Sequence, residues 1–471
     1  MENNKQNKIW TDNTQIKAIP SLKGIDEVLR ILTSQTIGEL AKKYKKFLIF
    51  PERLSPKTAD SKILDGYYNN ENSFYLRTTN IMGVISYFDE REHKEPITIS
   101  IGSRFDSSEK QIFFVYLLSH VFDFNIVDWK PQTGEIELWD LLLVFLFIYH
   151  LEKAYRQGLF KQYVLRRYNE YNFKGALDAQ RHINENIPFT GRVAYKFKEM
   201  SYDNPVLHLI RYTTDYVHSK YGNLWRGLLT NKWVVNEAVR VIREATPSYT
   251  PQSRLKIYHT SLKPIRHPFY TEYETLRKIC MRLLRNEGLN VYEGTGDRIY
   301  GVLFDGAWLW ERYIAKLLKP LGFKHFVFPD DKEIFAFEKN SGPYYYLYPD
   351  FYNEGRRLVF DAKYKRWDEK DEEDKRGDYH QILAYMYVTL AEAGGIIFPK
   401  QTEETIDKSI GINYMRVRNV GKPFYEIAFH IPKTDDGKFR KEIGDNEKDF
   451  VERLQSILHS DEKGLNSTGR E

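Results

Sequence analysis

Two aspartates and a lysine in the C-terminal third of the chain have the types and the spacing to bind a divalent metal ion. Asp350 follows a proline, Asp361 comes after ten further residues, and Lys363 lies two residues beyond it. Mg²⁺ prefers oxygen ligands and keeps several waters, so a few protein ligands suffice to hold it. Hydrolysis of a phosphodiester requires a neutralised phosphate charge and a nucleophilic water, and carboxylates that hold such an ion can supply both. We therefore predict Asp350 and Asp361 as ligands of Mg²⁺ or Mn²⁺, and the backbone carbonyl of Ala362 as another ligand.

Lys363 is expected on the same face of a strand as Asp361, because alternate side chains of a strand point the same way. Its ammonium group would orient the attacking water and offset the charge of the transition state. Other Asp-x-Lys sequences begin at residues 60, 330, 368, 436 and 461, all in polar stretches typical of solvated loops. Only Asp361 follows an apolar run, 358–360, and charges at such a buried edge are costly without a function. The alternative is a strand end whose two charges simply reach solvent.

Three further residues are candidates for supporting this site. Glu311 lies among aromatic residues in a helix predicted over 305–318, where it is either an exposed residue or a further metal ligand. Gln381 and Tyr385 stand at i and i+4 of a helix predicted over 379–392, so they share one face of that helix. We expect both to support the site or to contact the DNA backbone, and the alternative for Tyr385 is core packing.

Several charged residues near Lys363 have weaker interpretations. Lys365 and Arg366 are candidates for DNA binding, since lysine and arginine neutralise phosphate charge, with ordinary surface charge as the alternative. His380 is expected to point away from the site, because side chains at i and i+1 of a helix diverge. The acidic run 368–376 is interpreted as a solvated loop rather than as a second metal site.

The composition fits a cytoplasmic protein of two to four domains with no membrane partner. The chain has 471 residues, of which 42% are hydrophobic, so it can bury sizeable cores. Its 70 basic and 65 acidic residues leave a net charge of +5, which permits nucleic-acid binding without arguing for it. The single cysteine, Cys280, excludes an internal disulfide and suits a reducing cytosol. The N-terminus shows no signal peptide. The most apolar run, 141–149, is shorter than the about 20 residues of a membrane span and predicts a buried helix.

The pattern along the chain predicts a multidomain α+β fold. Residues 1–135 are expected to form a β-rich N-terminal domain, with a helical stretch over 25–45 and strands at 47–50, 73–76 and 97–101. Residues 136–300 are expected to form a helical middle region, with helices over 139–163, 206–218, 231–244 and 270–285. Residues 301–460 alternate helix and strand, which predicts an α/β domain around a mixed central sheet. Its strands are expected at 326–328, 344–348, 358–360, 395–398 and 424–430, and residues 461–471 are predicted to be a disordered tail.

Together these motifs resemble the PD-(D/E)XK nuclease superfamily. The resemblance rests on Glu311, Pro349-Asp350, Asp361-Ala362-Lys363 and Gln381-x-x-x-Tyr385 in their order along the chain, and the Gln–Tyr pair is similar to the RecB-like branch. More narrowly, residues 361–365 followed by residues 378–385 resemble McrC, the nuclease subunit of McrBC modification-dependent restriction systems. The resemblance covers residues 140–400 and is strongest over 305–390, and it implies a PD-(D/E)XK endonuclease domain over 301–460.

The McrC resemblance also implies a partner. McrC proteins supply the site that cleaves double-stranded DNA, and their N-terminal part docks on a hexameric ring of the AAA+ GTPase McrB and stimulates GTP hydrolysis. The resemblance therefore implies that residues 1–135 dock on a McrB-like ring, that the partner binds GTP, and that the complex serves in anti-phage defence. The chain has no Walker A pattern of its own, which fits dependence on a partner.

Two other functions remain open from the sequence. One is a stand-alone RecB-like DNA nuclease, against which the large non-nuclease N-terminal half argues. The other is a non-catalytic, GTPase-activating scaffold with a vestigial nuclease fold, against which the intact Asp350, Asp361 and Lys363 argue.

Overall fold

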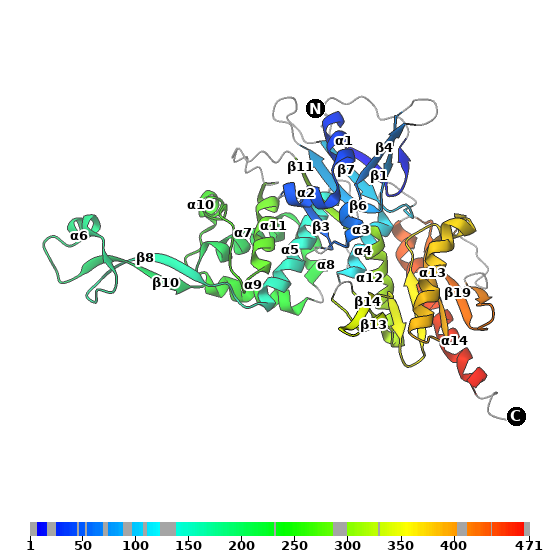
Figure 1. Cartoon of the computed structure of the whole chain (residues 1–471). Coiled ribbons are helices and arrows are strands. Elements are labelled where there is room, and N and C mark those ends of the chain that lie inside the picture. Colours follow the sequence, from blue (N-terminus) through cyan, green and yellow to red (C-terminus); the bar gives the residue numbers. More distant parts are fainter. Residues whose placement is uncertain are drawn as a thin grey trace. The chain divides into compact units, whose positions relative to one another are not determined.

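The computed structural model divides the chain into two compact units (Figure 1). One unit combines Met1–Asp123 with Gly296–Glu471, and the other is Phe124–Thr295. This division differs from the predicted scheme of three consecutive domains, because a strand from the C-terminal half completes the N-terminal sheet. The structure describes residues 7–16, 25–44, 47–51, 54–68, 74–87, 97–106, 111–122, 138–229, 232–285, 299–327, 330–402, 412–434 and 436–465.

The N-terminal part of the first unit is built on a five-stranded sheet of order β1-β7-β6-β11-β3. Its strands are β1 (Asn7–Thr11), β3 (Phe47–Phe50), β6 (Ile81–Tyr87), β7 (Ile97–Gly102) and β11 (Ile299–Asp305). A smaller sheet contains β2 (Gln15–Ile16), β5 (Phe74–Thr78) and β4 (Leu64–Tyr68). The strands predicted at 47–50 and 97–101 are confirmed within a residue, and the strand predicted at 73–76 is confirmed as β5, which continues to Thr78.

Four described helices accompany the two sheets of this part, and they are α1 (Ile25–Ser34), α2 (Ile37–Lys43), α3 (Pro56–Asp60) and α4 (Ile112–Val121). Of these, α1, α2 and α4 bury apolar side chains. The single helical stretch predicted over 25–45 is interrupted, because Thr36 starts a new helix. Its hydroxyl accepts a hydrogen bond from Glu39 N, and Thr36 N donates to the Glu39 carboxylate, which together form a capping box.

The second unit is a helical body from which a long arm extends (Figure 1). The body contains α5 (Leu138–Arg156), α7 (Pro205–Lys220), α8 (Gly222–Leu229), α9 (Trp233–Ala245), η1 (Pro251–Ser253), α10 (Arg254–Thr260) and α11 (Glu272–Arg285). The apolar run 141–149 is part of α5 and is almost entirely buried, as predicted. Cys280 is also buried here and forms no disulfide. No helix in the described part of the chain is long and apolar enough to cross a membrane.

The arm comprises residues 162–201, and its first two residues were predicted as the end of a helix. The helix predicted over 139–163 ends at Arg156, and Gly158 follows in the left-handed region that favours glycine. Strand β8 (Gln162–Glu170) then pairs antiparallel with β10 (Val193–Ser201) along its whole length. Between them lie β9 (Ala176–Leu177) and α6 (Ala179–Glu185) at the far end of the arm (Figure 1).

The C-terminal part of the first unit contains a six-stranded sheet of order β12-β15-β16-β17-β19-β18. Its strands are β12 (Lys324–His325), β15 (Phe351–Asn353), β16 (Leu358–Ala362), β17 (Ala393–Thr402), β19 (Pro423–Pro432) and β18 (Ile412–Arg416). The β16–β17 and β17–β19 pairs are parallel and the other pairs are antiparallel, so the sheet is mixed, as predicted.

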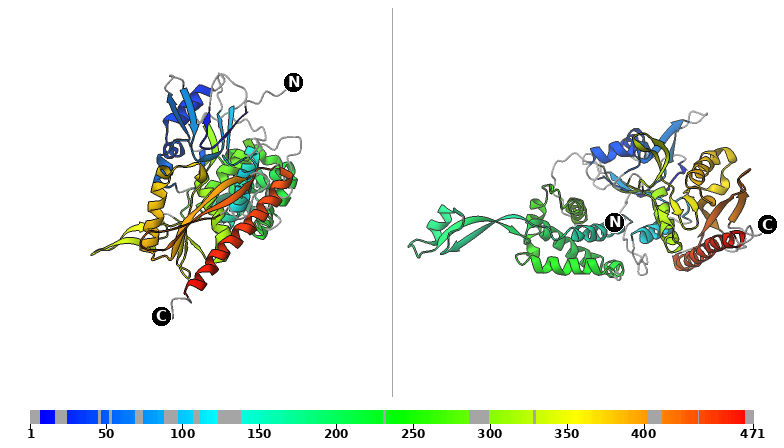
Figure 2. Two further views of the ribbon diagram at one scale, coloured as in Figure 1. Left: turned by 90° about the vertical axis from the view of Figure 1, so that its right-hand side faces the viewer. Right: turned by 60° about the horizontal axis from the view of Figure 1, so that its bottom comes forward.

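Helices cover both faces of this sheet. Helix α13 (Glu372–Val388) packs on the face that carries Val359 and Ile396. On the other face, Phe429 contacts α12 (Gly306–Leu318) and α14 (Asp436–Leu465) through the rings of Trp310 and Phe450. Figure 2 shows α13 and α14, in gold and red, on opposite sides of the sheet. Asp361 is two residues beyond Val359 on β16, so its side chain faces α13.

Four local predictions for this part are wrong in detail. The strand predicted at 344–348 is β14 (Gly342–Leu347), which forms a separate hairpin with β13 (Ile334–Lys339) outside the six-stranded sheet. The strand predicted at 326–328 is replaced by β12, and residue 328 lies outside the described residues. The loop predicted at 368–376 is exposed but partly helical, because it contains η3 (Trp367–Glu369) and the first residues of α13. Asp371 caps α13, and its side chain accepts a hydrogen bond from Asp374 N. The disordered tail predicted at 461–471 is helical as far as Leu465, where α14 ends, and residues 466–471 lie outside the described residues.

Candidate active site

Asp350 and Asp361 are brought together by an antiparallel strand pair. Strand β15 begins directly after Asp350, and its register pairs Phe351 with Phe360. The ten residues between the two aspartates are thus a strand, a turn and a returning strand. One carboxylate oxygen of Asp350, Oδ2, accepts a hydrogen bond from Ala362 N at 2.7 Å. The spacing noted in the sequence therefore reflects a hairpin that places both carboxylates at the same edge.

Lys363 joins these carboxylates to helix α13. Its Nζ lies 2.6 Å from Asp361 Oδ2 and donates a hydrogen bond to Gln381 Oε1 at 2.8 Å. Gln381 Nε2 in turn donates to the Tyr385 hydroxyl at 2.7 Å, and that hydroxyl donates to the Tyr348 carbonyl at 3.2 Å. Gln381 and Tyr385 thus share the helix face expected from their spacing. Gln381 binds the Lys363 ammonium, and Tyr385 in turn binds Gln381. Tyr385 is at the same time buried in the core beneath α13.

Asp378 is part of this cluster although the sequence analysis gave it no role. Its Oδ1 lies 3.3 Å from Lys363 Nζ, and its Oδ2 lies 2.6 Å from Lys365 Nζ. A signal was present, because Asp378 precedes Gln381 by three residues and so lies on the same helix face. The candidate phosphate contact Arg366 is also engaged, since it donates to the backbone carbonyl of Arg104 at 3.0 Å.

Glu311 approaches the cluster from α12 together with a histidine that the sequence analysis missed. Its Oε1 lies 3.3 Å from His325 Nε2, and His325 Nδ1 donates to the Asp350 carbonyl at 3.0 Å. A lone histidine in a two-residue strand carries no periodic signal, so only the fold reveals it. His380, by contrast, is exposed on α13, as expected for the neighbour of Gln381.

The electrostatics of the cluster show an excess of negative charge. Burial raises the pKa of Asp350, and the charges of Asp361 and Glu311 raise it further. Burial also raises the pKa of Asp361, and it raises that of Glu311 to about 8 with the charge of Asp361 as the next cause. Burial disfavours the Lys363 ammonium, but the charges of Asp361 and Asp350 outweigh this effect and raise its pKa. A cation placed among these groups would stabilise their ionised forms.

The donors fit a hard divalent cation such as Mg²⁺ or Mn²⁺. Asp361 Oδ2 is buried, and the Lys363 ammonium lies 2.6 Å from it. Two carboxylates at one strand edge, balanced by a single close ammonium, are oxygen donors of the kind that Mg²⁺ prefers. Among the described residues, no three His, Cys, Asp or Glu side chains already surround a common point. The Lys363 ammonium and a bound ion therefore compete for the same carboxylate.

Tyr364 ties the site to the N-terminal sheet. Its side chain points away from the two lysines that flank it, and only 3% of it is exposed. The hydroxyl lies 2.7 Å from Ser103 Oγ, and the guanidinium of Arg104 lies 4.9 Å from the ring centre. Arg104 is itself held by a buried ion pair with Asp12 at 2.6 Å. The segment that carries Lys363 is thus anchored by residues far away in sequence.

We predict that Tyr364→Ala lowers the free energy of unfolding by about 3–5 kcal/mol, as is typical when a buried aromatic side chain is removed. Tyr364→Phe should cost only about 1 kcal/mol, because it loses one hydrogen bond and keeps the packing. Urea unfolding followed by tryptophan fluorescence measures both effects, with Trp310 centred 6.5 Å from the Tyr364 ring. Tyr387→Ala is the control, since Tyr387 is 82% exposed. Equal effects of Tyr364→Ala and Tyr387→Ala would contradict the anchoring role.

Comparisons with known proteins place the chain in a family. Residues 76–399 match the family described as "McrBC 5-methylcytosine restriction system component". This match spans more than half of the chain, so the chain belongs to the McrBC family, and the predicted membership of the McrC type is confirmed. The family match extends further toward the N-terminus than the resemblance based on motifs, which began at residue 140.

Two solved structures from Thermococcus gammatolerans are similar to the chain. A half-complex of McrB AAA+ hexamers with bound McrC gives 14% identity and a TM-score of 0.49, covering 96% of this chain and 100% of that one. A structure of the McrBC complex gives 12% identity and a TM-score of 0.30, covering 66% of this chain and 87% of that one. No curated protein matches the chain.

Proposed function

We propose that the chain is the DNA endonuclease subunit of a restriction complex and hydrolyses phosphodiester bonds with Mg²⁺. The observation that carries this proposal is the group of half-buried Asp350, buried Asp361 and half-buried Lys363 at adjoining strand ends, with Gln381 hydrogen-bonded to the lysine. The mixed sheet flanked by α12 and α13 supports assignment to the PD-(D/E)XK superfamily. Membership in a restriction-system family supports DNA as the substrate.

Each residue of the group has a separate task in this proposal. Asp350, Asp361 and the Ala362 carbonyl would hold the ion, with Glu311 as a further ligand. A bound Mg²⁺ supplies charge neutralisation at the phosphate and a water of lowered pKa. Lys363 orients the attacking water and offsets the charge that develops on the phosphate, because its ammonium remains protonated among the carboxylates. Gln381 and Asp378 keep that ammonium at the carboxylate edge.

We predict that DNA cleavage requires Mg²⁺ or Mn²⁺ and stops in EDTA. Plasmid cleavage with the partner GTPase and GTP present measures this requirement. Mg²⁺ should also raise the melting temperature of the wild-type chain alone. An ion that binds only the folded state adds about 2.7 kcal/mol to the free energy of unfolding when its concentration is 100 times its Kd. In Asp350→Asn this rise should be absent. Undiminished cleavage in EDTA would contradict a metal-dependent mechanism.

We propose in addition that the chain works with a McrB-like AAA+ hexamer that binds the GTP. We assign docking to the arm, whereas the McrC resemblance implied residues 1–135. Its far end carries large apolar side chains that are more than half exposed: Tyr171, Phe173, Ile183, Ile187 and Phe189. Exposed apolar patches of this kind mark sites of protein interaction. The N-terminal sheet, in contrast, contributes Ser103 and Arg104 to the nuclease part through Tyr364.

The two alternative functions have distinct signatures in the same assays. A stand-alone RecB-like nuclease would cut DNA at full rate without GTP or partner. A non-catalytic scaffold would stimulate GTP hydrolysis but cut no DNA under any metal condition. The buried carboxylates and their lysine favour the nuclease subunit over the scaffold, because a vestigial site has no reason to retain this costly arrangement.

A further inference from the structure

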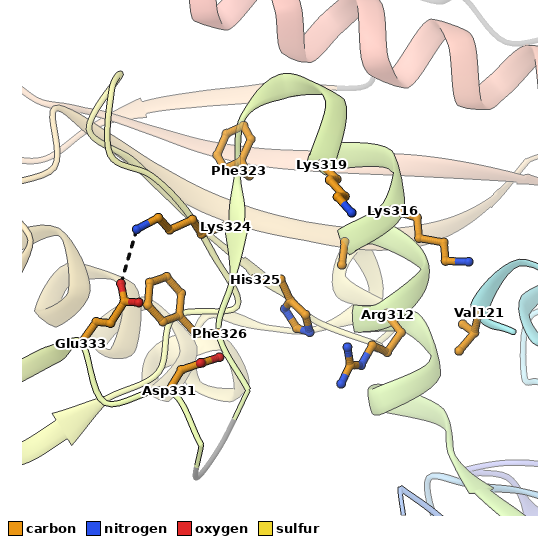
Figure 3. Close-up of a pocket in the computed structure, with 11 residues that line it drawn as sticks. Val121, Arg312, Lys316, Lys319, Phe323, Lys324, His325, Phe326, Asp331 and Glu333 are labelled. Carbon is orange, nitrogen blue, oxygen red and sulfur yellow. Dashed lines mark hydrogen bonds and ion pairs between the residues drawn. The ribbon is translucent and has the colours of Figure 1, made fainter. Parts of the chain in front are cut away.

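A basic pocket is lined by side chains of α12, β12 and the segment that follows β12 (Figure 3). Its volume is about 480 Å³, and its lining includes Arg312, Lys316, Lys319, Lys324 and His325. His325 is shared with the candidate active site, because its ring also contacts the Asp350 carbonyl and Glu311. His325 therefore lies between the pocket and the carboxylate cluster.

Helix α12 carries basic side chains that line the pocket and an acidic side chain that faces the carboxylate cluster. Arg312, Lys316 and Lys319 stand at i, i+4 and i+7, so they follow one face of the helix and of the η2 turn (Lys319–Leu321) that extends it. Glu311 precedes Arg312 by one residue and so points in a different direction, toward Asp361. One helix thus presents a carboxylate to the metal ligands and a row of cations to the pocket.

Two of these cations form no ion pair within the described part of the protein. Lys316 donates to the His120 carbonyl, and Lys324 makes ion pairs with Glu333 and Glu354 at 3.4 and 3.5 Å. Arg312 and Lys319 make no ion pair with any residue that the structure describes, and Arg312 Nε is buried without a hydrogen-bond partner among those residues. Figure 3 shows the Arg312 guanidinium directed toward the His325 ring.

The two acidic residues of the pocket are engaged by other groups. Asp331 accepts a hydrogen bond from Val327 N at 2.8 Å, and Glu333 is paired with Lys324. The lining thus holds four lysine or arginine side chains against two carboxylates, which leaves a net positive charge. An anion with oxygen acceptors is the ligand that suits this lining.

We propose that this pocket binds a backbone phosphate of the DNA strand that is cut, next to the phosphate at Asp350 and Asp361. The proposal rests on the nuclease function proposed above and adds a subsite to it. Successive phosphates of a strand rise by about 3.4 Å, so a strand seated at the carboxylates passes its neighbouring phosphate across the adjoining wall. Arg312 binds that phosphate through its planar guanidinium, and Lys319 adds a point charge.

Binding of a short fluorescent DNA duplex to the full-length chain, measured in EDTA at several salt concentrations, tests the proposal without cleavage. Arg312→Gln and Lys319→Gln should each weaken binding and flatten the dependence of log Kd on log salt by about one unit per lost phosphate contact. Arg312→Lys should restore part of the affinity, because it keeps the charge. Lys448→Gln is the matched control, since Lys448 is exposed on α14 far along the chain.

Two results would overturn the proposal. Lys319 is exposed, so Lys319→Gln should fold normally, and an unchanged Kd and salt slope in this variant and in Arg312→Gln would exclude a phosphate contact. Tighter competition by GTP than by inorganic phosphate, lost in Arg312→Gln, would instead identify the pocket as a nucleotide site. Because the assay contains no metal, it measures phosphate binding even if the chain proves unable to cut DNA, which separates failure of the subsite from failure of the proposed function.

Discussion

Asp361→Asn is expected to reduce DNA cleavage by on the order of 100- to 1,000-fold, the range seen when one electrostatic group is removed from an active site. The substitution keeps the shape of the side chain but removes the charge that would bind the metal ion. Its partner Lys363 retains Gln381 and Asp378, so the lysine is not left without neighbours. Plasmid cleavage with Mg²⁺, GTP and the partner GTPase measures the loss.

The same variant should fold and should still stimulate GTP hydrolysis. Burial raises the pKa of Asp361, which means that its charge is unfavourable in the folded chain, so a neutral asparagine should not lower the melting temperature. Asp368→Asn is the matched control, because Asp368 begins another Asp-x-Lys sequence but lies exposed near Lys400. If Asp361→Asn cuts at the wild-type rate, the assigned site is wrong.

Ile183→Asp combined with Phe189→Asp is expected to abolish stimulation of the partner GTPase. Both side chains are exposed on the arm, at 56% and 66%, so the charges should not disturb folding. Aromatic and apolar anchors at interfaces contribute about 2 kcal/mol or more each, so the pair should weaken complex formation by on the order of 100-fold or more. GTP turnover by the partner, measured against increasing concentrations of the variant, reveals the loss.

Leu255→Asp is the control for this pair, since Leu255 is 58% exposed on α10 in the same unit but outside the arm. It should leave GTP turnover unchanged. The double variant should also retain the Mg²⁺-induced rise in melting temperature, because the metal site lies in the other unit. Full stimulation by the double variant would exclude the arm as the docking element.

The motif residues could be found from the sequence because their signals are local. Asp361 and Lys363 extend an apolar strand, and Gln381 and Tyr385 repeat at helical spacing, so each pattern is set by neighbours within a few positions. The helix over 305–318 was equally clear, with Asp305 capping its start by accepting from Ala307 N. Such features depend on the period of a helix or strand and on nothing distant.

The arm escaped prediction because its first strand has no deeply buried face. Strand β8 alternates only between exposed and half-buried residues, so it lacks the apolar period that marks a core strand. Helix α13 was predicted to start too late for a related reason. Its first turn is acidic and exposed, and only the cap at Asp371 marks it as helical.

Contacts between distant segments were decided by the tertiary structure alone. The sequence determined which residues carry chemistry: two carboxylates, a lysine and the Gln–Tyr pair that follows. The fold decided that His325 and Asp378 join them and that Tyr364 is anchored by Ser103. It also decided that β11, which follows the whole second unit in the sequence, lies between β6 and β3 of the N-terminal sheet. These contacts form between segments that are distant in the sequence, and the periodicity within one segment does not show which distant segment it will contact.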